Sequence, residues 1–381
     1  MNIYVVKQGD SLYSIANRFG VNPTTLANFN ELTDPNVLVV GQTIVIPGAP
    51  NPNRPTTDTN AYVEWYTEKP SQAVLDEVKK RGPLLTYMMP FSYEVKRDGT
   101  LTPLDWSGLD QIAQDQNMVS AIVISNIENG AFSDTLAQDI FASTAVQDKL
   151  IQNILTEAKA KNAKDIHVDF EYLRKEDRQN YVNFLKRLKT AAKAKGLTLS
   201  AALAPKTSAD QVGKWYGGHD YKKIGEVVDF VVIMTYEWGY SGGPPMAVSP
   251  IGPVRNVLTY ALTEIPAKKI MMGQNLYGYD WTLPYKPGNP PAQTISPKRA
   301  VELARERNAA ILYDEVAQAP YFNYWRDGKE HVVWFEDARS IKAKFDLLKE
   351  LGLKGISYWH IAFQFPQNWV VLNEMFHVKK R

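Results

Sequence analysis

The sequence predicts an α/β protein in which an eight-stranded (β/α)8 barrel follows a small βααβ domain. The chain has 381 residues, and at roughly 150 residues per domain this length allows two or three domains, or one barrel and a small module. A proline-rich segment separates a short N-terminal part from the rest. The longer part contains apolar, β-rich runs with helical stretches between them, which is the pattern of a (β/α)8 barrel.

The composition indicates an ordinary folded chain without a strongly charged partner. Apolar residues make up 44% and charged residues 22%. The 43 Lys and Arg against 41 Asp and Glu leave a net charge of +2, so we expect neither nucleic acid nor a membrane surface as the main partner. The chain has no cysteine, which excludes disulfides and cysteine nucleophiles. We expect no metal, no cofactor and a monomer.

The N-terminus predicts no ordinary signal peptide. Residues Met1–Gln8 lack the basic start, apolar stretch and small-residue cleavage site of such a segment. No uninterrupted apolar run approaches the ~20 residues that are needed to cross a bilayer.

The first domain, residues 1–48, is predicted to fold as strand, helix, helix and strand. Gly9-Asp10 or Ser11 offers an N-cap, and apolar residues at helical spacing after it predict a first helix that ends at Gly20. Asn22 followed by Pro23 is a cap with proline at the first helical position, and predicts a second helix. The run Thr43–Pro47 supplies the closing strand.

A linker is predicted between the two domains. The stretch Pro47–Asn60 contains four prolines and no large apolar side chain, which indicates a semi-extended segment that contributes to no core. We assign residues 49–60 to the linker and residues 61–381 to the large domain. The two domains are expected to share no core.

Eight apolar runs predict the strands of the barrel. The clearest helix between them keeps 3.6-residue spacing from Tyr181 to Ala192 and ends at Gly196. A doubly wound sheet is the alternative, but no glycine-rich phosphate loop follows the first run. Surplus chain over Leu283–Asp337 predicts a small α+β insertion between strands seven and eight. The runs are Ala61–Tyr66, Leu84–Tyr93, Val119–Ile127, Ile166–Leu173, Leu197–Ala204, Val227–Trp238, Lys269–Tyr279 and Lys354–Ile361.

Three ionisable residues of the fourth run share one face. Alternate side chains of a strand point the same way, so His167, Asp169 and Glu171 are predicted to point into the barrel. Barrel interiors are normally filled by branched apolar residues, and unpaired buried charge costs free energy. The cluster therefore indicates a functional site. The neighbours expected to face the helices are Ile166, Val168, Phe170 and Tyr172.

Two carboxylates in this arrangement suit the cleavage of a glycosidic bond. Glu171 as an acid would protonate the departing oxygen, and burial beside Asp169 would raise its pKa. An ordinary retaining enzyme needs its second carboxylate across the bond, where Asp169 is poorly placed. The remaining route is attack on C1 by the substrate's own 2-acetamido group, with Asp169 stabilising the positive intermediate.

The N-terminal domain resembles a LysM module over Tyr4–Pro47. Such modules bind glycans that contain N-acetylglucosamine, in a shallow groove between the first strand–helix loop and the second helix–strand loop. Purely structural capping and turn roles for Asp10, Ser11 and Asn30 remain the alternative. The resemblance implies glycan contacts from the two loops at Gly9, Asp10, Ser11, Asn30, Leu32 and Pro35.

The fourth strand resembles the signature Asp-x-x-Asp-x-Asp-x-Glu of family-18 glycoside hydrolases. Its four positions hold Lys164, His167, Asp169 and Glu171. The two carboxylates that do the chemistry match, whereas the two outer aspartates do not. His167 stands in place of the inner aspartate that usually shares a proton with the neighbouring carboxylate, and a hydrogen-bond role is expected for His167 instead.

Three later strands resemble the same family, whose fold is the TIM barrel. Met234–Trp238 resembles Met-x-Tyr-Asp with Glu237 in place of the aspartate, Gln274–Trp281 resembles a segment that lines the sugar site, and Gly355–Trp359 resembles strand eight. The resemblance implies that Tyr236 bonds the acetamide carbonyl and acts with Glu171 and Asp169 in catalysis. It implies substrate binding by Trp359, Met234, Gln274, Tyr277, Asn126 and Trp238.

A LysM module before such a barrel resembles the group of spore cortical fragment-lytic enzymes. The resemblance implies an N-acetylglucosaminidase that acts on spore cortex peptidoglycan, located in the spore, with peptidoglycan or other N-acetylglucosamine glycans as its partner. A chitinase that acts on chitin oligomers has the same chemistry and stays open. A non-catalytic glycan-binding protein is the third possibility, against which the presence of Glu171 argues.

Overall fold

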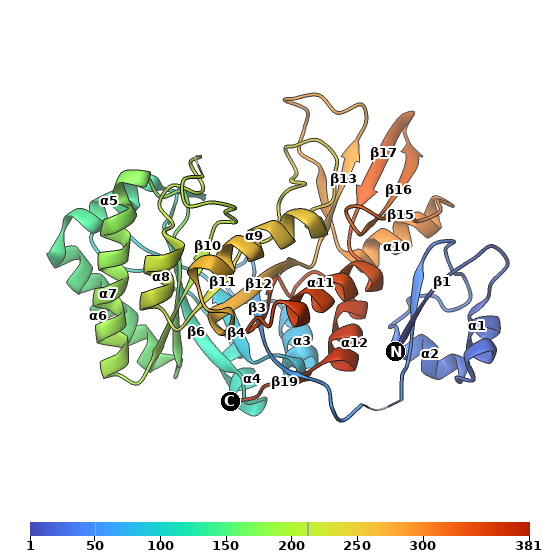
Figure 1. Cartoon of the computed structure of the whole chain (residues 1–381), viewed down its shortest axis with the longest axis horizontal. Helices are drawn as coiled ribbons and strands as arrows, with labels where there is room; N and C mark the ends of the chain where they lie inside the picture. The colour runs from blue at the N-terminus through green and yellow to red at the C-terminus, as the bar shows by residue number, and fades with distance from the viewer. Residues whose placement is uncertain (50, 212) are drawn as a thin grey trace.

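The structure is a computed structural model, and it describes residues 1–49, 51–211 and 213–381. Figure 1 shows a ring of strands surrounded by helices, with the small N-terminal domain beside it. Within these described ranges, no helix is long and apolar enough to cross a membrane.

Eight parallel strands close the barrel, as the sequence predicts. Strands that follow one another along the chain pair in order, and the last pairs with the first to complete the ring. Two short strands, β5 (Tyr93–Glu94) and β19 (His377–Val378), extend this sheet. The barrel strands are β3 (Thr56–Glu64), β4 (Tyr87–Phe91), β6 (Val119–Ser125), β9 (Asp165–Asp169), β10 (Thr198–Leu203), β11 (Phe230–Ile233), β12 (Ile270–Asn275) and β18 (Gly355–Trp359).

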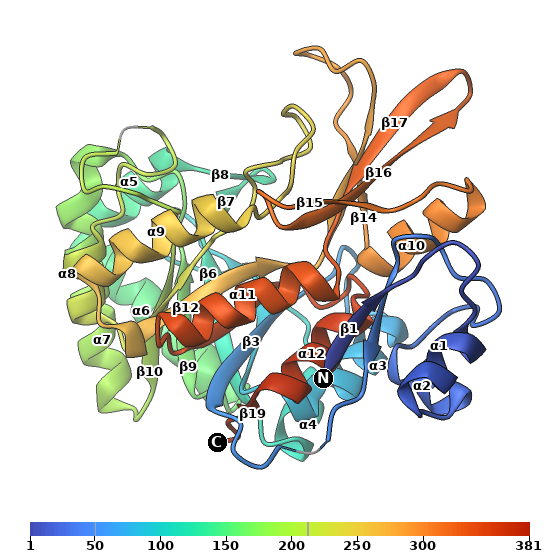
Figure 2. The same ribbon diagram turned by 45° about the vertical axis from the view of Figure 1, so that its right-hand side comes forward.

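Helices cover the outer face of the barrel (Figure 2). Helix α7 buries the apolar face that the spacing predicts, and Gly196 follows it with a φ of 70°. The main core lies between strands and helices, and a smaller aromatic core fills the barrel interior. The helices are α3 (Gln72–Arg81), α4 (Leu109–Asp115), α5 (Asp134–Ala142), α6 (Thr144–Ala160), α7 (Arg178–Ala194), α8 (Tyr221–Val227), α9 (Ile251–Glu264), α11 (Ala338–Glu350) and α12 (Pro366–Met375).

The predicted insertion between strands seven and eight is an antiparallel sheet of five strands with one helix. It begins at Gly278, earlier than the predicted Leu283. The strands lie in the order β14-β13-β17-β16-β15. Its elements are β13 (Gly278–Thr282), β14 (Gln293–Ile295), α10 (Pro297–Glu306), β15 (Leu312–Asp314), β16 (Ala319–Arg326) and β17 (Lys329–Trp334).

The N-terminal domain has the predicted βααβ order. Ser11 caps the first helix, Gly20 ends it with a φ of 65°, and Asn22 caps the second. These caps are local hydrogen-bond patterns, which is why short sequence signals found them. The elements are β1 (Asn2–Val5), α1 (Leu12–Phe19), α2 (Pro23–Phe29) and β2 (Thr43–Ile46).

The barrel begins earlier than the predicted residue 61. Strand β3 starts at Thr56, inside the segment 49–60 that we assigned to the linker; Pro50 of that segment lies outside the described residues. From Thr57 onward the polar start of β3 is buried, and its side chains bond to neighbouring segments of the barrel. Thr59 Oγ1 donates to the Leu84 carbonyl at 2.7 Å, and Asn60 Nδ2 donates to Ser357 Oγ at 2.7 Å.

The expectation that the two domains share no core is wrong. Val45 of β2 belongs to the main core of the barrel. The guanidinium of Arg81, a residue only 5% exposed, contacts the Glu31 carboxylate at 2.7 and 3.0 Å. The backbone N of Ile311 in the insertion donates to the Val40 carbonyl at 2.8 Å. Both views place the N-terminal domain against α12 and the insertion (Figures 1 and 2).

Candidate active site

A cleft of about 660 Å³ opens near the carboxyl ends of the barrel strands. This is the end of a (β/α)8 barrel at which active sites form, because the strand–helix loops meet there. The structure brings six of the predicted site residues to its lining: Asp169, Glu171, Met234, Tyr236, Tyr277 and Trp359.

The predicted inward face of strand β9 is confirmed. Asp169 is the last residue of β9, Glu171 follows two residues later, and both are buried. Ile166, Val168 and Phe170 point into the strand–helix core, as expected. Tyr172 does not: it lies three residues beyond the end of β9 with a φ of 56°, is 43% exposed and lines the cleft.

The surroundings of Glu171 favour its protonated form. Burial is the main cause of its strongly raised pKa, and the charge of Asp169 adds to it. The indole Nε1 of Trp215 donates to Oε2 at 2.5 Å and opposes part of this shift. Burial raises the pKa of Asp169 to about 7. Two buried, interacting carboxyls of this kind suit a general acid and a neighbour that stabilises positive charge.

Asn126 holds the backbone of Glu171. Its Oδ1 accepts from the Glu171 N at 2.8 Å, and its Nδ2 donates to the Glu171 carbonyl at 2.9 Å and to the Ser133 carbonyl at 3.0 Å. The side chain of Asn126 is fully buried, with its amide used in these bonds. The structure therefore brings Asn126 to the acid's backbone, and its predicted contact with substrate has no support from this geometry.

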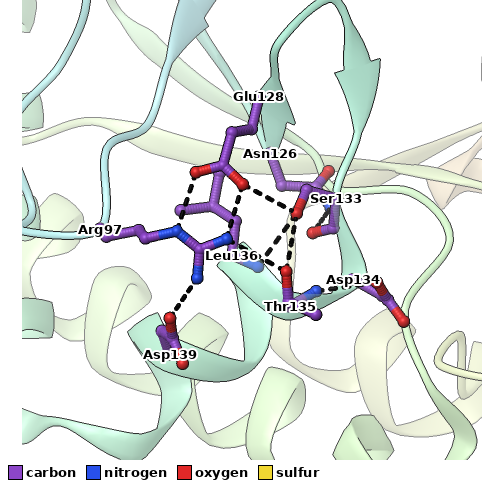
Figure 3. Close-up of polar contacts among 8 residues, drawn as sticks. All are labelled: Arg97, Asn126, Glu128, Ser133, Asp134, Thr135, Leu136 and Asp139. Atoms are coloured by element: carbon purple, nitrogen blue, oxygen red, sulfur yellow. Dashed lines mark hydrogen bonds and ion pairs between the residues drawn. The ribbon is translucent and has the colours of Figure 1, made fainter.

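A polar network fixes the hairpin that follows Asn126 (Figure 3). The hairpin consists of β7 (Ile127–Glu128) and β8 (Ala131–Phe132). Arg97 donates to both Glu128 oxygens at 2.8 and 2.6 Å and also bonds Asp139 of α5. Ile127 and Phe132 line the cleft. The ion pairs thus support one wall of the site, and sequence reasoning missed them because their partners are 31 and 42 residues apart.

His167 lies in a chain of buried hydrogen bonds beneath the cleft. Its Nε2 is 2.7 Å from the Tyr62 hydroxyl, and its Nδ1 is 2.8 Å from Ser200 Oγ. Ser200 in turn donates to Asp165 Oδ2 at 2.6 Å. Burial lowers the pKa of His167 to about 3, so its ring is neutral at ordinary pH. The predicted hydrogen-bond role of His167 fits this geometry.

Tyr236 projects into the cleft beside the two carboxylates. Burial raises its pKa strongly, and the Asp169 and Glu171 charges add to this shift, so the hydroxyl keeps its proton. A Cβ on Gly273 would lie 2.9 Å from Tyr236 Cε1, and glycine there leaves room for the ring. The neighbouring Glu237 carboxylate accepts from Tyr277 and, at 2.9 Å, from Tyr279.

Trp359 forms an apolar surface of the cleft at the end of β18. Its ring contacts Phe91 edge-on, with centroids 4.8 Å apart, and Tyr62 at 5.2 Å. A sugar ring has an apolar face that matches such a surface. Gln274 and Trp238 are not brought to the cleft. Gln274 is fully buried, with Nε2 donating to the Asn275 carbonyl at 2.9 Å, and Trp238 packs against the main core.

Several lining residues were not predicted. Trp215 lies in the long loop after β10, far in sequence from the acid to which it donates. Aromatic residues in loops are a weak signal because most serve a core. The unpredicted residues of the lining include Glu64, Tyr66, Trp215, Tyr240 and His360.

The predicted LysM groove is only partly open. Gly9 and Ser11 are exposed, whereas Asp10 Oδ2 accepts from Tyr4 and from the Lys7 N. Asn30 is buried, and its amide bonds the backbone of Leu26 and Val45.

The second loop of that groove faces the insertion rather than open solvent. Leu32 is half-buried against the domain's own core, and Pro35 is also half-buried. Thr33 Oγ1 donates to Glu302 Oε1 at 2.7 Å, and Asp34 lies 3.8 Å from Arg305. The structure thus gives the loop 30–35 contacts with the large domain.

No metal-binding group is visible in the part of the chain that the structure describes. Among these residues, no three His, Cys, Asp or Glu side chains are placed to hold an ion.

Comparison with known proteins agrees with this geometry. Residues 60–363 match the glycosyl hydrolases of family 18, and residues 4–47 match the LysM domain. The cortical fragment-lytic enzymes of Bacillus subtilis (strain 168) and Bacillus anthracis are 46% and 48% identical to this chain, covering all of it and 99% and 100% of themselves.

Solved structures show the same relationship. The spore cortex-lytic enzyme SleL of Bacillus megaterium QM B1551 has a TM-score of 0.96 at 46% identity, covering 100% of this chain and 99% of that one. A chitinase from Chromobacterium violaceum ATCC 12472 has a TM-score of 0.76 at 25% identity, covering 84% of this chain and 98% of that one. With its carboxylate pair at the end of the fourth barrel strand, this chain belongs to the family-18 glycosyl hydrolases and carries an N-terminal LysM domain.

Proposed function

We propose that this chain is an N-acetylglucosaminidase that hydrolyses spore cortex peptidoglycan fragments during germination. The observation that carries the proposal is the pair Asp169 and Glu171, both buried in one cleft beside Tyr236. Full-length similarity to cortical fragment-lytic enzymes supports the substrate. A spore location follows from that substrate, and a single chain holds all of the proposed residues.

The first chemical step breaks the bond between C1 and the leaving oxygen. Glu171 donates its proton to that oxygen while the carbonyl oxygen of the substrate's 2-acetamido group attacks C1. A cyclic oxazolinium ion forms, and Asp169 stabilises its positive charge from the acetamide nitrogen side. Tyr236 donates a hydrogen bond to the acetamide oxygen and holds it in line for attack.

The second step opens the ring with water. Glu171, now a carboxylate, removes a proton from the water that attacks C1, and the acetamide is restored. Two inversions at C1 give net retention. The raised pKa of Glu171 suits both roles, because the group is protonated before the first step and basic after it.

The chitinase alternative has the same chemistry and is favoured only by similarity of fold. Mass spectrometry of the products from cortex fragments and from chitin oligomers separates the two. Faster cleavage of cortex fragments by the wild type, absent in Glu171→Gln, is the expected result. Equal or faster cleavage of chitin oligomers would replace cortex by chitin as the substrate.

A further inference from the structure

An acid–imidazole pair lines the same cleft, on other strands than the reacting carboxylates. Glu64 ends strand β3 and His360 follows strand β18, the two strands whose pairing closes the barrel. Both side chains line the cleft. The mechanism above uses neither of them.

His360 is buried with its hydrogen-bonding capacity unused. The residue is 3% exposed, and neither ring nitrogen has a hydrogen-bond partner among the described residues. Nε2 lies 3.3 Å from Glu64 Oε2 without hydrogen-bond alignment. Burial lowers the pKa of His360 to about 4, so the neutral ring offers one donor and one acceptor. Buried polar groups normally have partners, and one without them in a cleft points to a ligand.

Glu64 supplies an acceptor beside that ring. Its side chain is 17% exposed, and Oε2 accepts from the Tyr66 hydroxyl at 2.6 Å. A carboxylate oxygen has further lone pairs, so Glu64 can also accept from a sugar hydroxyl or an amide N–H.

Aromatic rings border this pair. Tyr66 is 83% exposed although its hydroxyl is fixed by Glu64. The Trp359 ring lies 5.6 Å and the Phe363 ring 4.5 Å from the His360 ring, centroid to centroid. Exposed aromatic faces beside fixed polar groups are the usual composition of a site that orients a small ligand.

We propose that Glu64, His360 and Tyr66 form a subsite for the sugar unit next to the one on Trp359, and that this subsite selects an uncharged unit. Hydroxyl or amide N–H groups of that unit donate to Glu64, and His360 bonds a neighbouring polar group. A free carboxylate on the same unit is disfavoured because it would face Glu64 in a desolvated cleft. This inference rests on the proposed function, since it assumes a glycan in the cleft.

The test measures binding without cleavage, in the Glu171→Gln background. The neutral probe is the tetramer of N-acetylglucosamine. The acidic probe is a peptidoglycan tetrasaccharide of the same length from which the peptides have been removed. Its lactyl groups are therefore free acids, whereas a lactyl group that carries a peptide is an uncharged amide. Calorimetry measures the Kd of each probe for three proteins: the Glu171→Gln background, the double variant with Glu64→Gln, and the double variant with Glu68→Gln. Glu68 is an exposed glutamate of the same loop outside the cleft, and its variant is the matched control.

In the background protein and the Glu68→Gln control, the Kd for the acidic probe is expected to exceed the Kd for the neutral probe by about tenfold or more. In the Glu64→Gln variant this ratio of Kd values should fall below about threefold. Unchanged Kd values in Glu64→Gln would overturn the proposal. Tyr66→Ala, at an exposed side chain, is a second variant that leaves the core intact. It should weaken both probes several-fold, and unaltered binding would also contradict the subsite.

The proposed function and the subsite fail separately. If the wild type cleaves neither glycan while the Glu64-dependent preference is present, the hydrolase assignment fails and the subsite stands. If the wild type cleaves glycans but Glu64→Gln binds both probes like the control, the subsite fails alone.

Discussion

The Tyr62 hydroxyl lies 2.7 Å from Nε2 of His167, and the hydrogen bonds on the other side of the ring determine which nitrogen carries the proton. Ser200 donates its hydroxyl hydrogen to Asp165, so it can only accept from Nδ1 of His167. Nε2 therefore accepts from Tyr62. A neutral imidazole held in this tautomer cannot share a proton with Asp169 as a neighbouring aspartate would.

Burial of neutral histidines predicts a loss of stability in acid. The pKa of His167 is lowered to about 3, and the pKa values of His219 and His360 to about 4, by burial. Between these values and the unfolded value of about 6.5, the unfolded chain binds more protons than the folded one, so stability falls as the pH falls. Each group contributes a slope of up to about 1.4 kcal/mol per pH unit.

Urea unfolding of the wild type and His167→Gln between pH 7 and pH 4 measures this term. The raised pKa of Asp165, about 7, acts in the opposite sense, because stability from such a group falls as the pH rises. The Asp165 carboxyl is present in both proteins. The difference between their unfolding free energies as a function of pH therefore reports the contribution of the His167 region. The variant should lose less stability on acidification than the wild type. Parallel curves for wild type and His167→Gln would contradict the neutral, buried state of His167.

Replacement of the acid should remove turnover and keep binding. Glu171→Gln has nearly the same size but no transferable proton, so kcat should fall by ~10²–10⁴-fold. The Kd for glycan should change little, because the amide still accepts from Trp215. Steady-state kinetics and calorimetry on one preparation measure both quantities. Near-full turnover in a clean preparation would remove Glu171 from the mechanism.

The Trp215 hydrogen bond predicts a shift of the pH profile. The indole stabilises the Glu171 carboxylate and opposes the rise of its pKa. In Trp215→Phe the pKa of Glu171 should rise further, so the acid stays protonated to higher pH. The alkaline limb of kcat/KM should therefore move to higher pH, with Trp238→Phe, outside the cleft, as the control. Movement to lower pH would show that the indole does not act through the acid.

Substrate assistance predicts dependence on the N-acetyl group. De-N-acetylated fragments should be almost inert, because they lack the nucleophile. A thiazoline analogue should inhibit as a mimic of the cyclic intermediate. Asp169→Asn should lower turnover strongly, and Tyr236→Phe should lower it less, because only one acetamide contact is lost. Product followed by NMR should appear first as the β-anomer; initial release of the α-anomer is incompatible with this route.

The domain interface predicts that the LysM domain stabilises the barrel. Deletion of residues 1–48 exposes the surface under Val45 and leaves Arg81 with Glu77 as its carboxylate partner. We expect a lower Tm, reduced retention on insoluble peptidoglycan and continued cleavage of soluble fragments. Glu31→Gln should lower the free energy of unfolding by about 1 kcal/mol, since Glu31 is partly exposed. An unchanged Tm in the deletion would mean that the contacts add no stability.

Local patterns predicted the parts of the fold that local physics determines. The caps at Ser11 and Asn22 depend on side chains that bond their own helix ends. The inward placement of Asp169 and Glu171 depends on strand alternation, which continues to Glu171, two residues after β9 ends. Alternation fails at Tyr172, which lies beyond the end of the strand and has a positive φ.

The rest depends on contacts that no short segment encodes. The start of β3 is polar and resembles a linker until neighbouring strands satisfy its side chains. Trp215 reaches Glu171 across 44 residues. Gln274 shows the limit of a motif, because a matching segment places some residues in the cleft and others behind it. The docking of the first domain on the second is also non-local, and a proline-rich composition argued against it.

The docking of Val40 and Gly41 on Ile311 fixes the N-terminal domain against the barrel's insertion, where the proline-rich segment predicts a flexible arm. Gly41 has a φ of 86°, and a Cβ there would lie 1.8 Å from the Ile311 carbonyl oxygen, so the fit admits no larger residue without displacement. If the exposed Gly9–Ser11 loop binds glycan, as the LysM resemblance implies, the bound strand meets the catalytic cleft at one fixed angle. Strands in an intact, cross-linked wall cannot rotate to that angle, whereas released fragments tumble freely. Such a fixed geometry would favour released fragments over the intact wall.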